Sequence, residues 1–428
     1  MIVPSIDLMQ RRAVQLRGGR DFVLDGGDPL ARLEEFAVAG EVAVVDLDAA
    51  LGKGGGSNAA LIREMVRRAP CRVGGGIRDL DTARAWLDAG AAKIMIGTAA
   101  SPDFCAALPR ERVIAAVDAE RGQVVVEGWR TATGTPVLER IRELAPVVGG
   151  FLFTQVEKEG AMSGFDFQAV AAAVRASEEV RLTAAGGITT ATEIAELDRI
   201  GADAQVGMAL YTGRLALGEA VAAPLVNPVG DVWPTVVCDE WGHALGLVWS
   251  TRESLARGIA ERKGIYWSRS RQALWEKGAT SGNTQELVRV DLDCDRDALR
   301  FTVRQHGAGF CHLEQPACWP AEFALDDLER TIATRAASLP LADPGSRTSK
   351  LLGDPVLLAA KLREEAVELA QADTRTEVVH ETADLLYMAL VALVRGGGSL
   401  AEVRAELARR HAGVTRRPMT AKAPADAP

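Results

Sequence analysis

Acidic and thiol side chains alternate in one short segment, residues 289–303, which reads RVDLDCDRDALRFTV. Asp293, Asp295 and Asp297 fall on every second residue, and Cys294 lies among them. Because alternate residues of a strand face one side, the three carboxylates are expected to share one face and the thiol the other. Three carboxylates on one face suit a hard cation such as Mg²⁺. A solvated acidic edge is the alternative, and it does not require this alternation.

Cys311 and Cys318 follow that segment, so three of the six cysteines lie close together in the sequence. With Cys294 they offer three thiolates, which suit Zn²⁺ and leave a fourth position for water. Zinc lowers the pKa of bound water to about 7 and so supplies hydroxide at neutral pH. Buried free cysteines are the alternative. In a cytosolic enzyme, such a cluster favours a metal over disulfides.

Two further carboxylates lie at the ends of apolar runs in the first half of the chain. Asp7 closes the first of these runs, and Asp118 closes the fifth. Two facing carboxylates suit paired acid and base catalysis, in which one handles the proton of a ring oxygen and the other a carbon-bound proton. A capping role is the alternative for either aspartate taken alone.

Glycines repeat at nearly the same offset as the two aspartates. The separation of Gly75 from Gly186 equals that of Asp7 from Asp118, and the separation of Gly97 from Gly207 is shorter by a single position. Exposed backbone amides at such positions can cradle phosphate groups. Two cradles imply a substrate with a phosphate at each end. The residues expected to form them are Gly75, Gly76, Gly97, Thr98, Gly186, Gly187 and Gly207.

Carboxylates also recur at helical spacing near the end of the chain. Glu364, Glu365 and Glu368 lie on one predicted helix, and Glu381 and Asp384 lie on the next. Spacings of three and four place these residues on shared faces, where like charges mildly destabilise a bare helix. Two helices that present such pairs suit Mg²⁺. A solvated acidic face remains the alternative.

The elements that must position these residues begin with a repeating unit in residues 1–220. Eight short apolar runs alternate there with amphipathic, Ala-rich stretches. This alternation predicts parallel strands with crossover helices, and eight such units predict a (β/α)8 barrel built from two similar halves. The runs cover residues 2–7, 42–48, 71–77, 93–98, 113–119, 150–156, 181–188 and 204–210.

Beyond the barrel the pattern predicts a multidomain chain. Residues 214–232 lose the strand pattern and are interpreted as a linker. Residues 233–322 are strand-rich and predict a small α+β zinc domain. Residues 323–412 are helical, with a break at the glycines 396–398, and predict an all-α domain. Residues 413–428 are rich in Pro, Ala, Thr and Lys and are expected to be disordered.

The composition is that of a globular protein, with 48% hydrophobic and 25% charged residues. A net charge of −9 argues against a nucleic-acid partner, which usually requires a basic stripe. The start, MIVPSIDLMQ, lacks the basic and long apolar regions of a signal peptide. No apolar run reaches the roughly 18 residues of a membrane span. A cytoplasmic protein without a membrane partner is therefore expected.

Motifs spread over the whole barrel carry a family resemblance: MIVPSIDL, VDLDAALGK, VGGGIR, IGTAA, VDAERGQVVVEGW, FTQVEKEGAMSG and AAGGITT. They resemble the ProFAR isomerase of histidine biosynthesis. The resemblance implies an Amadori rearrangement of an aldose aminoglycoside to a ketose, with Asp7 and Asp118 as base and acid. It also implies that Thr154 is a positioning hydroxyl, that Arg78 lies near a phosphate and that Trp129 is a stacking lid residue.

One loop departs from this family pattern. Where the family usually has Asp-Gly-Thr after the sixth strand, this chain has Glu159, Gly160 and Ala161. Glu159 is expected to replace the family's Asp as an acid–base group on a loop that closes over the substrate.

The block WSRSRQALWEKGATSGNTQ, followed by LDCDRD and CH, resembles phosphoribosyl-AMP cyclohydrolase. The resemblance implies hydrolytic opening of the adenine ring, with zinc-bound hydroxide attacking C6 and His312 as a candidate proton shuttle. In this family the three cysteines come from two subunits, so a homodimer through this domain is implied. The residues implied to hold the ribose phosphate are Trp267, Ser268, Arg269, Arg271, Thr280 and Ser281.

EEAVE and the following ETAD resemble the phosphoribosyl-ATP pyrophosphohydrolase, a relative of the all-α nucleotide pyrophosphohydrolases. The resemblance implies that water attacks a triphosphate held by Mg²⁺ and that pyrophosphate is released. Arg335 and Lys361 are the implied phosphate contacts.

The three resemblances imply consecutive reactions, carried in reverse order along the chain. Phosphoribosyl-ATP becomes phosphoribosyl-AMP, the adenine ring opens to give ProFAR, and ProFAR is isomerised to PRFAR. Phosphoribosylated adenine nucleotides and ProFAR are thus the expected substrates, and Zn²⁺ and Mg²⁺ the expected cofactors. In the alternative, the barrel is a non-catalytic or substrate-shifted scaffold, and only the cyclohydrolase and the pyrophosphohydrolase are active.

Overall fold

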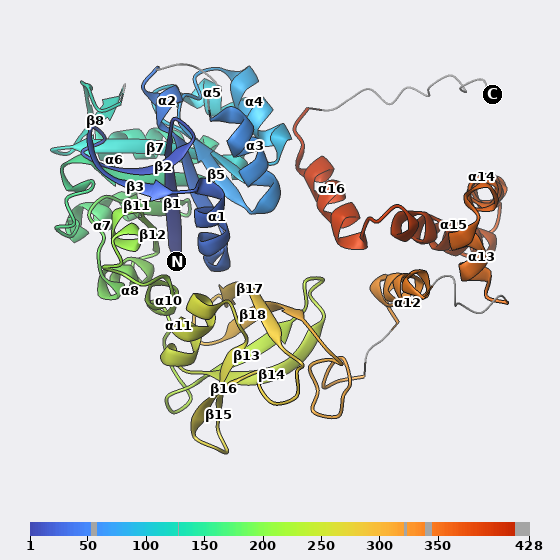
Figure 1. The fold of residues 1–428 in the computed structure, drawn as a ribbon. Coiled ribbons are helices and arrows are strands. Elements are labelled where there is room, and N and C mark those ends of the chain that lie inside the picture. The colour runs from blue at the N-terminus through green and yellow to red at the C-terminus, as the bar shows by residue number, and fades with distance from the viewer. Residues whose placement is uncertain (53–57, 127, 321–322, 339–344, 416–428) are drawn as a thin grey trace. The chain divides into compact units, whose positions relative to one another are not determined.

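The computed structural model describes residues 1–52, 58–126, 128–320, 323–338 and 345–415. The chain divides into two compact units, one of Met1–Cys318 with the residues from Ala412 onward, the other of Trp319–His411. The first unit holds a barrel and a small sheet domain, and the second is built of helices (Figure 1). From residue 416 onward, the tail that was expected to be disordered lies outside the described residues.

Eight parallel strands close into a ring, which confirms the predicted (β/α)8 barrel. The strands follow one another around the ring in chain order, and the last, β12, pairs with the first, β1. Apolar side chains such as Val3, Ile114 and Leu152 fill the barrel interior. The strands are β1 (Ile2–Met9), β4 (Val42–Asp46), β5 (Cys71–Gly74), β6 (Lys93–Ile96), β7 (Val113–Glu120), β10 (Gly150–Gln155), β11 (Arg181–Ala185) and β12 (Ala202–Val206).

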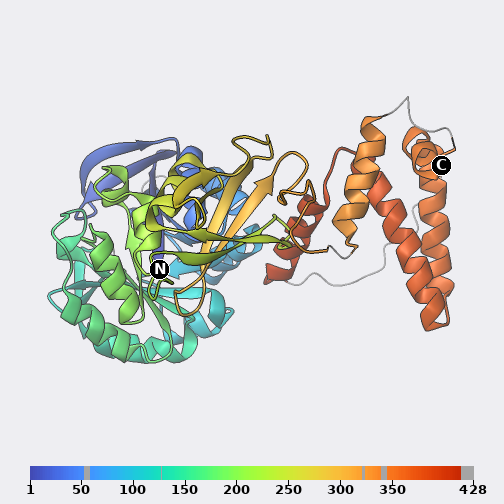
Figure 2. The ribbon, with the colours of Figure 1, turned by 90° about the horizontal axis from the view of Figure 1, so that it is seen from below.

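Helices follow the strands and cover the outside of the barrel (Figure 2). Several begin at a side-chain cap, as at Asp79, whose carboxylate accepts a hydrogen bond from the Thr82 backbone amide. The run predicted as a strand over residues 204–210 is a strand only to Val206, because the chain turns at Gly207 into a short helix. The helices are α1 (Pro29–Phe36), α2 (Leu47–Ala50), α3 (Ala59–Arg68), α4 (Leu80–Ala89), α5 (Pro102–Ala106), α6 (Val137–Leu144), α7 (Phe167–Ala176), α8 (Ala191–Arg199) and α9 (Met208–Tyr211), with 3-10 turns at Ala37–Ala39, Arg110–Arg112, Ala145–Val147 and Val156–Lys158.

Two antiparallel hairpins extend from the barrel and repeat the relation between its halves. One follows β1 and the other follows β7. Asp7 pairs with Val14 in the first and Asp118 with Val125 in the second, so the two valines have the same offset in sequence as the two aspartates. The repeat seen in the sequence therefore extends to the strand register. The added strands are β2 (Arg12–Arg17), β3 (Asp21–Gly27), β8 (Gln123–Val126) and β9 (Thr131–Pro136).

The segment interpreted as a linker contains a helix, α10 (Leu217–Ala222), that packs against α11 (Arg252–Glu261) of the sheet domain. At Gly218 the two backbones are so close that a Cβ would lie 2.6 Å from the Ala256 Cα. Val221 and Leu225 are buried beside them. Loss of strand periodicity thus marks a packed joint between the barrel and the sheet domain.

The small domain is a six-stranded sheet with the strand order β16-β15-β14-β13-β18-β17. β13 and β18 are parallel, and the other neighbouring strands are antiparallel. Phe301 and Tyr266 are among its fully buried side chains, and they contact each other in the core. The strands are β13 (Trp233–Cys238), β14 (Ala244–Ser250), β15 (Ile265–Ser268), β16 (Ala273–Glu276), β17 (Gln285–Leu292) and β18 (Leu299–Gln305).

The second unit is all helical, as predicted. Its two longest helices pack side by side along their length (Figure 2). Met388, Val391 and Leu358 lie in the apolar seam of the unit, and the last helix begins after the predicted break at residues 396–398. The helices are α12 (Leu325–Ala337), α13 (Arg347–Gly353), α14 (Pro355–Gln371), α15 (Arg375–Arg395) and α16 (Leu400–Ala412).

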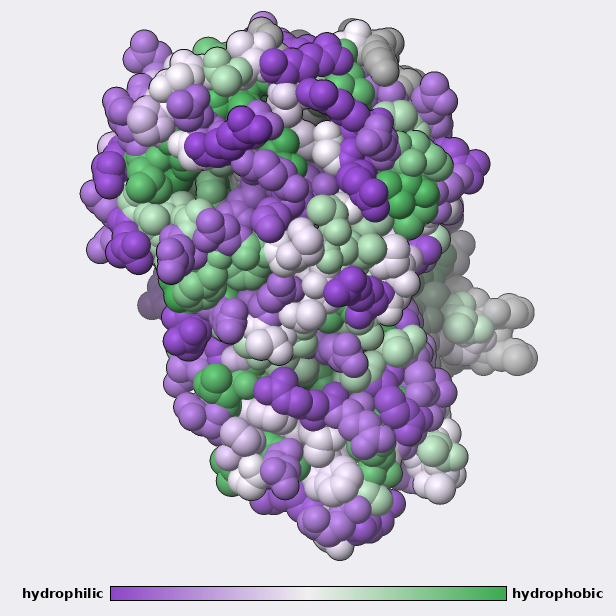
Figure 3. Space-filling view, turned by 90° about the vertical axis from the view of Figure 1, so that its left-hand side faces the viewer, coloured by the Kyte–Doolittle hydropathy of each residue, from purple (hydrophilic) through white to green (hydrophobic). Residues whose placement is uncertain are grey.

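Among the described residues, no single helix is long and apolar enough to cross a membrane, although α15 and α16 together pass that test by length and composition with a bend of 109° between them. On the barrel and the sheet domain, hydrophilic side chains mix with small apolar patches over the face drawn in Figure 3.

Candidate active sites

A cavity of about 1200 Å³ opens at the end of the barrel where the strands finish. The strand ends bring Asp7 of β1, Asp118 of β7 and Thr154 of β10 to its wall, and Glu159 reaches it from the loop after β10. The topology thus gathers carboxylates that are far apart in the sequence, as expected for opposed strands of a barrel. Other predicted residues at this cavity are Gly75, Gly76, Arg78, Gly97, Thr98 and Trp129.

Asp118 is held by two side chains at the mouth of the cavity. Burial raises the pKa of the Asp118 carboxyl, and hydrogen bonds from the side chains of Trp129 and Thr154 oppose that rise. Thr154 is itself buried, and it pairs with Asp118 in the parallel register of β10 and β7. Trp129 adopts a left-handed backbone conformation, with φ of +65°. Two donors therefore fix the orientation of this carboxyl group.

The other two carboxyl groups have pKa values near neutral pH. Burial raises the pKa of Asp7 to about 7. Burial also raises the pKa of Glu159 to about 8, and the charges of Asp7 and Asp118 raise it further. Carboxyl groups with pKa values near the working pH are suited to exchange protons with a substrate.

The glycine pairs of the two half-barrels have matching backbone conformations. Gly75 has a φ of +95° and Gly186 a φ of +96°, a backbone conformation that residues other than glycine rarely adopt. A Cβ at Gly75 would lie 2.2 Å from the Asp46 carbonyl oxygen, so the glycine is also needed for close packing. In the second half, Gly186, Gly187 and Gly207 line a smaller pocket that Glu159 also reaches.

Two polar residues that line the barrel cavity were not predicted from the sequence. Ser5 and Gln205 line both the large cavity and the smaller pocket. The Oε1 atom of Gln205 is buried without a hydrogen-bond partner among the described residues. They lie within strands rather than at strand ends, so no spacing signal distinguishes them from core residues.

In the sheet domain, the acidic run forms the turn between β17 and β18. Carboxylate oxygens of Asp293, Asp295 and Asp297 lie within 4.8 Å of one another. The charge of Asp295 raises the pKa of Asp297, with smaller contributions from burial and from Asp293. Oxygen donors crowded in this way fit a hard divalent cation.

The three cysteines do not meet within one chain. Cys311 and Cys318 are close enough to share a hydrogen bond, and the pKa of Cys318 is raised by burial and by Cys311. Cys294 is exposed in the β17–β18 turn, with its sulfur 4.0 Å from Asp295 Oδ1. Among the described residues, no group of three or more metal ligands includes a cysteine. Three thiols have the donor chemistry that suits zinc. In one chain, however, Cys311 and Cys318 lie together and Cys294 lies apart from them in the β17–β18 turn.

Two further side chains lie next to the cysteine pair. The Nδ1 atom of His312 is 3.9 Å from the Cys311 sulfur. Lys277, which sequence reasoning did not select, is 8% exposed. Burial lowers the pKa of Lys277, while Cys318 and Cys311 oppose that shift. The only sequence signal for Lys277 is its place in the motif WEKGATSGN.

The residues implied to hold ribose phosphate lie on two turns of the sheet domain. Trp267 and Ser268 end β15, and Arg271 donates to the Ser268 hydroxyl oxygen from its backbone amide at 3.3 Å and from Nε at 3.2 Å. The Arg269 guanidinium lies over the Trp249 ring, 4.2 Å from its centroid. Thr280 and Ser281 are exposed in the turn after β16.

In the helical unit, the two predicted acidic groups lie on adjacent helices. Glu364, Glu365 and Glu368 of α14 have carboxylate oxygens within 4.8 Å of one another. Glu381 and Asp384 of α15 form a second such group with His380, which sequence reasoning missed. Glu365 is only 4% exposed. Burial raises the pKa of Glu365, and the charges of Asp384 on the other helix and of Glu368 add to the rise.

The two basic residues predicted to contact phosphate have different surroundings. Lys361 Nζ lies 2.6 Å from Glu364 and 4.0 Å from Glu365. Arg335 donates from Nη1 to the Thr348 hydroxyl at 2.8 Å, and that hydroxyl is 2.7 Å from the Tyr387 hydroxyl. Lys361 therefore lies beside the acidic group. Arg335 belongs to a series of hydrogen-bonded side chains that ends at Tyr387 on α15.

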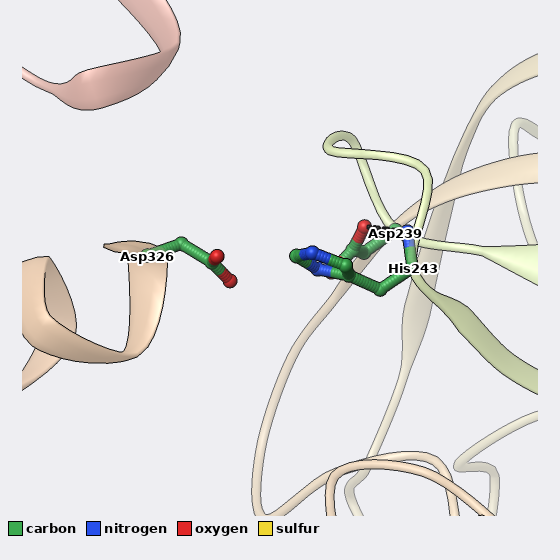
Figure 4. Close-up of side chains that lie close together, drawn as sticks. All are labelled: Asp239, His243 and Asp326. Atoms are coloured by element: carbon green, nitrogen blue, oxygen red, sulfur yellow. Dashed lines mark hydrogen bonds and ion pairs between the residues drawn. The ribbon is translucent and has the colours of Figure 1, made fainter. Parts of the chain in front are cut away.

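Outside the predicted sites, His243 and Asp239 face each other in the turn between β13 and β14 (Figure 4). His243 Nδ1 is 3.0 Å from Asp239 Oδ2, and the other carboxylate oxygen accepts from the backbone amides of Trp241 and His243. These hydrogen bonds give the pair a role in forming the turn.

In its fold, the chain is a (β/α)8-barrel protein that carries a small sheet domain and a helical unit. Three family models match it in succession: Histidine biosynthesis protein over residues 1–216, Phosphoribosyl-AMP cyclohydrolase over residues 246–320 and Phosphoribosyl-ATP pyrophosphohydrolase over residues 325–411. The first of these covers half of the chain. The chain therefore belongs to the histidine biosynthesis protein family.

Individual relatives resemble different shares of the chain. An imidazole-4-carboxamide isomerase of Methanosphaerula palustris is 36% identical over 234 residues, which are 52% of this chain and 98% of that protein. A histidine biosynthesis trifunctional protein of Saccharomyces bayanus is 41% identical over 222 residues, 51% of this chain. A histidine biosynthesis bifunctional protein of Schizosaccharomyces pombe is 45% identical over 191 residues, 45% of each chain. The chain spans 27% of the length of the first of these fungal proteins and 45% of the second.

Proposed function

We propose that this chain catalyses three consecutive steps of histidine biosynthesis. Residues 323–412 hydrolyse phosphoribosyl-ATP to phosphoribosyl-AMP and pyrophosphate, residues 233–322 open the adenine ring to give ProFAR, and residues 1–220 isomerise ProFAR to PRFAR. The observation that carries the proposal is the succession of three family matches on one chain. The pathway implies a cytoplasmic enzyme with phosphoribosylated substrates.

In the barrel, Asp118 gives a proton to the ring oxygen, the bond from that oxygen to carbon 1 breaks, and Asp7 removes the proton from carbon 2. The resulting enolaminol then takes a proton at carbon 1 and loses the proton of its carbon 2 hydroxyl, which gives the ketose. The raised pKa of Asp118 supports its role as the acid, and a pKa of about 7 lets Asp7 lose its proton at neutral pH. The glycines Gly75 and Gly186, which follow β5 in one half-barrel and β11 in the other, support two phosphate sites.

In the sheet domain, Asp293, Asp295 and Asp297 would hold Mg²⁺, and Cys311 and Cys318 with Cys294 would hold Zn²⁺. A bound zinc ion makes water a nucleophile near neutral pH. His312 is near enough to the cysteine pair to move a proton there. Because Cys294 lies apart from Cys311 and Cys318 in one chain, the proposed zinc site takes Cys294 from a second copy, which makes the enzyme a homodimer.

The complete sequence of reactions is tested by giving purified protein phosphoribosyl-ATP with Mg²⁺ and Zn²⁺. PRFAR is the expected end product, identified by chromatography and mass spectrometry. Accumulation of ProFAR, with no PRFAR formed from added ProFAR, would support the alternative in which the barrel is a scaffold.

Replacing a carboxylate of the helical unit should block the first reaction only. Glu365→Gln and Asp384→Asn remove charges from the two facing acidic groups, so binding of the triphosphate-bound Mg²⁺ is lost. Each variant should release pyrophosphate from phosphoribosyl-ATP roughly 10²-fold more slowly, the loss expected when a catalytic group is removed. Each should still process added phosphoribosyl-AMP.

Glu406→Gln is the matched control, because Glu406 lies on α16 and its carboxylate pairs with Arg409 and Arg410. Normal pyrophosphate release by the Glu365 and Asp384 variants would mean that these carboxylates belong to a solvated acidic face and bind no catalytic metal.

Glu159 should behave as an acid–base group of the barrel. Glu159→Gln removes the proton that the pKa of about 8 retains at neutral pH, and the kcat for ProFAR should fall by about 10²-fold. Glu159→Asp keeps the carboxyl group and restores the family's usual residue, so it should retain or raise kcat. Glu157→Gln on the same loop is the control. A Glu159→Gln variant as active as the parent would leave the proton transfers to Asp7 and Asp118 alone.

The same pKa shift predicts a change of stability with pH. The pKa of Glu159 rises from 4.5 to about 8 on folding. Its contribution to stability is therefore complete below about pH 4.5 and is lost as the pH rises through about 8. Relative to Glu159→Gln, the parent should lose roughly 4 kcal/mol of unfolding free energy between pH 5 and pH 9. Urea unfolding of both proteins at the two pH values measures this; equal losses would mean that Glu159 is not buried as a neutral acid.

A further inference from the structure

The acidic turn between β17 and β18 is shaped by its own backbone. One carboxylate oxygen of Asp293 accepts from the backbone amides of Asp297 at 3.0 Å and Ala298 at 3.1 Å. Arg296 lies at the tip in a left-handed conformation, with φ of +66°. The carboxylates of Asp293, Asp295 and Asp297 gather around this tip, so the position of Arg296 fixes where they meet.

The Arg296 side chain leaves the acidic group and binds the barrel. Its guanidinium donates from Nε and Nη2 to the two carboxylate oxygens of Asp198 on α8, at 3.1 Å and 3.2 Å. Its third nitrogen, Nη1, donates to the Asp293 carbonyl oxygen at 2.7 Å. Arg296 is 15% exposed and Asp198 12% exposed, so the pair is largely shielded from water. The side chain thus joins the backbone of the turn to a barrel helix.

A second contact ties the same residue to the joint between the domains. The Val226 backbone amide, which follows α10, donates to the Arg296 carbonyl oxygen at 3.0 Å. Asp198 also accepts from the Met1 amino group at 2.8 Å. Burial raises the pKa of Asp198, but Arg296 and that amino group outweigh it and hold the pKa below its usual range. Asp198 therefore stays ionised. Its two carboxylate oxygens pair with two nitrogens of the arginine, and such a bidentate pair fixes the relative orientation of the two groups.

The arginine charge is directed away from the place where a cation would bind. Three carboxylates at close range repel one another and move apart unless the backbone that carries them is held. Arg296 could have neutralised them, but its guanidinium nitrogens are bonded to Asp198 and to the Asp293 carbonyl oxygen. The pair leaves the negative charge of the turn intact while it restrains the turn.

We propose that the barrel positions the cation-binding turn of the cyclohydrolase domain through the Asp198–Arg296 pair. Arg296 is a positioning residue, and α8 of the isomerase barrel is a structural part of the cyclohydrolase site. The inference rests on the proposed function, because it takes the β17–β18 turn as a cation site.

The test measures Mn²⁺ binding to the full chain by electron paramagnetic resonance, with Mn²⁺ in place of Mg²⁺. The component that Asp295→Asn removes belongs to the turn. Arg296→Ala and Asp198→Asn should each weaken this component about 10-fold, as expected when a residue that orients metal ligands is lost. The double variant should be no weaker than either single one, because both remove the same link.

Arg300→Ala is the matched control, since Arg300 pairs with Asp291 beside the turn and within the sheet. It should leave Mn²⁺ affinity unchanged. Isomerisation of ProFAR should stay near the parent value in the two positioning variants, which separates positioning from loss of the fold.

Each contrary result overturns a different statement. If Arg296→Ala weakens Mn²⁺ binding and Asp198→Asn does not, the arginine acts within its own turn and the barrel has no part. If neither matters, the pair is only a contact between domains. If the parent has no Mn²⁺ component that depends on Asp295, the turn is not a cation site, and both the proposed metal and the inference are wrong.

Discussion

Asp7→Asn and Asp118→Asn are each expected to lower kcat/KM for ProFAR isomerisation by about 10²–10⁴-fold, the usual loss when a general acid or base is removed. Both side chains line one cavity although they come from different halves of the barrel. Asparagine keeps the shape of the group and removes its ability to exchange a proton. Steady-state assays with ProFAR measure the loss.

The two hydrolytic steps provide an internal control for these variants, because their proposed residues lie outside the barrel. Release of pyrophosphate and formation of ProFAR should continue at the parent rate. Full isomerase activity in both variants would contradict the assignment of acid and base.

The pH profile of Asp7→Asn adds a test of the geometry. The Asp7 charge is one of the causes that raise the pKa of Glu159 to about 8. Its removal should lower that pKa, so the residual activity should decline at a lower pH than in the parent. An unchanged alkaline limb would mean that the two groups do not interact.

Replacement of the clustered cysteines is expected to stop ring opening almost completely. Cys294→Ser, Cys311→Ser and Cys318→Ser should each lower bound zinc and cause phosphoribosyl-AMP to accumulate, because an open zinc site with three protein ligands fails when one is lost. Metal analysis and product identification measure the two effects. Cys238→Ser is the control, since Cys238 is a buried residue of β13 outside the cluster.

Mixing two inactive variants separates a shared zinc site from one within a single chain. In a dimer of Cys294→Ser and Cys311→Ser chains, one shared site keeps all three cysteines and the other lacks two. Refolding the two variants together should therefore restore ring opening to about one site per mixed dimer. No recovery would mean that the three cysteines meet within one chain after a rearrangement of the β17–β18 turn. Unchanged zinc and activity in the single variants would overturn the zinc assignment.

Much of the fold could be predicted because the spacing of apolar residues along the chain identifies each strand and helix. The eight apolar runs correspond to the eight barrel strands, since a buried parallel strand requires a short β-branched run whatever surrounds it. The helical unit followed in the same way from its 3.6-residue pattern. Asp7 and Asp118 could be proposed as partners because strand order in a barrel converts sequence position into position around the ring.

Residues without a periodic signal needed the tertiary structure. The segment 214–232 lost its strand pattern, yet it forms α10, whose close approach at Gly218 depends on a facing helix. Lys277 and Gln205 have no spacing that marks them, because each is defined by neighbours from distant parts of the sequence.

The sequence by itself determined the order of the elements and the residue types that can do chemistry. Only the tertiary structure decided the pKa values of those residues and the contacts between them. The pKa of Glu159 depends on burial and on two carboxylates from other strands, and Asp198 meets Arg296 from a distant part of the chain. Periodicity reports how a residue relates to its own element, whereas burial and Coulomb interactions act through space between elements that the chain brings together only on folding.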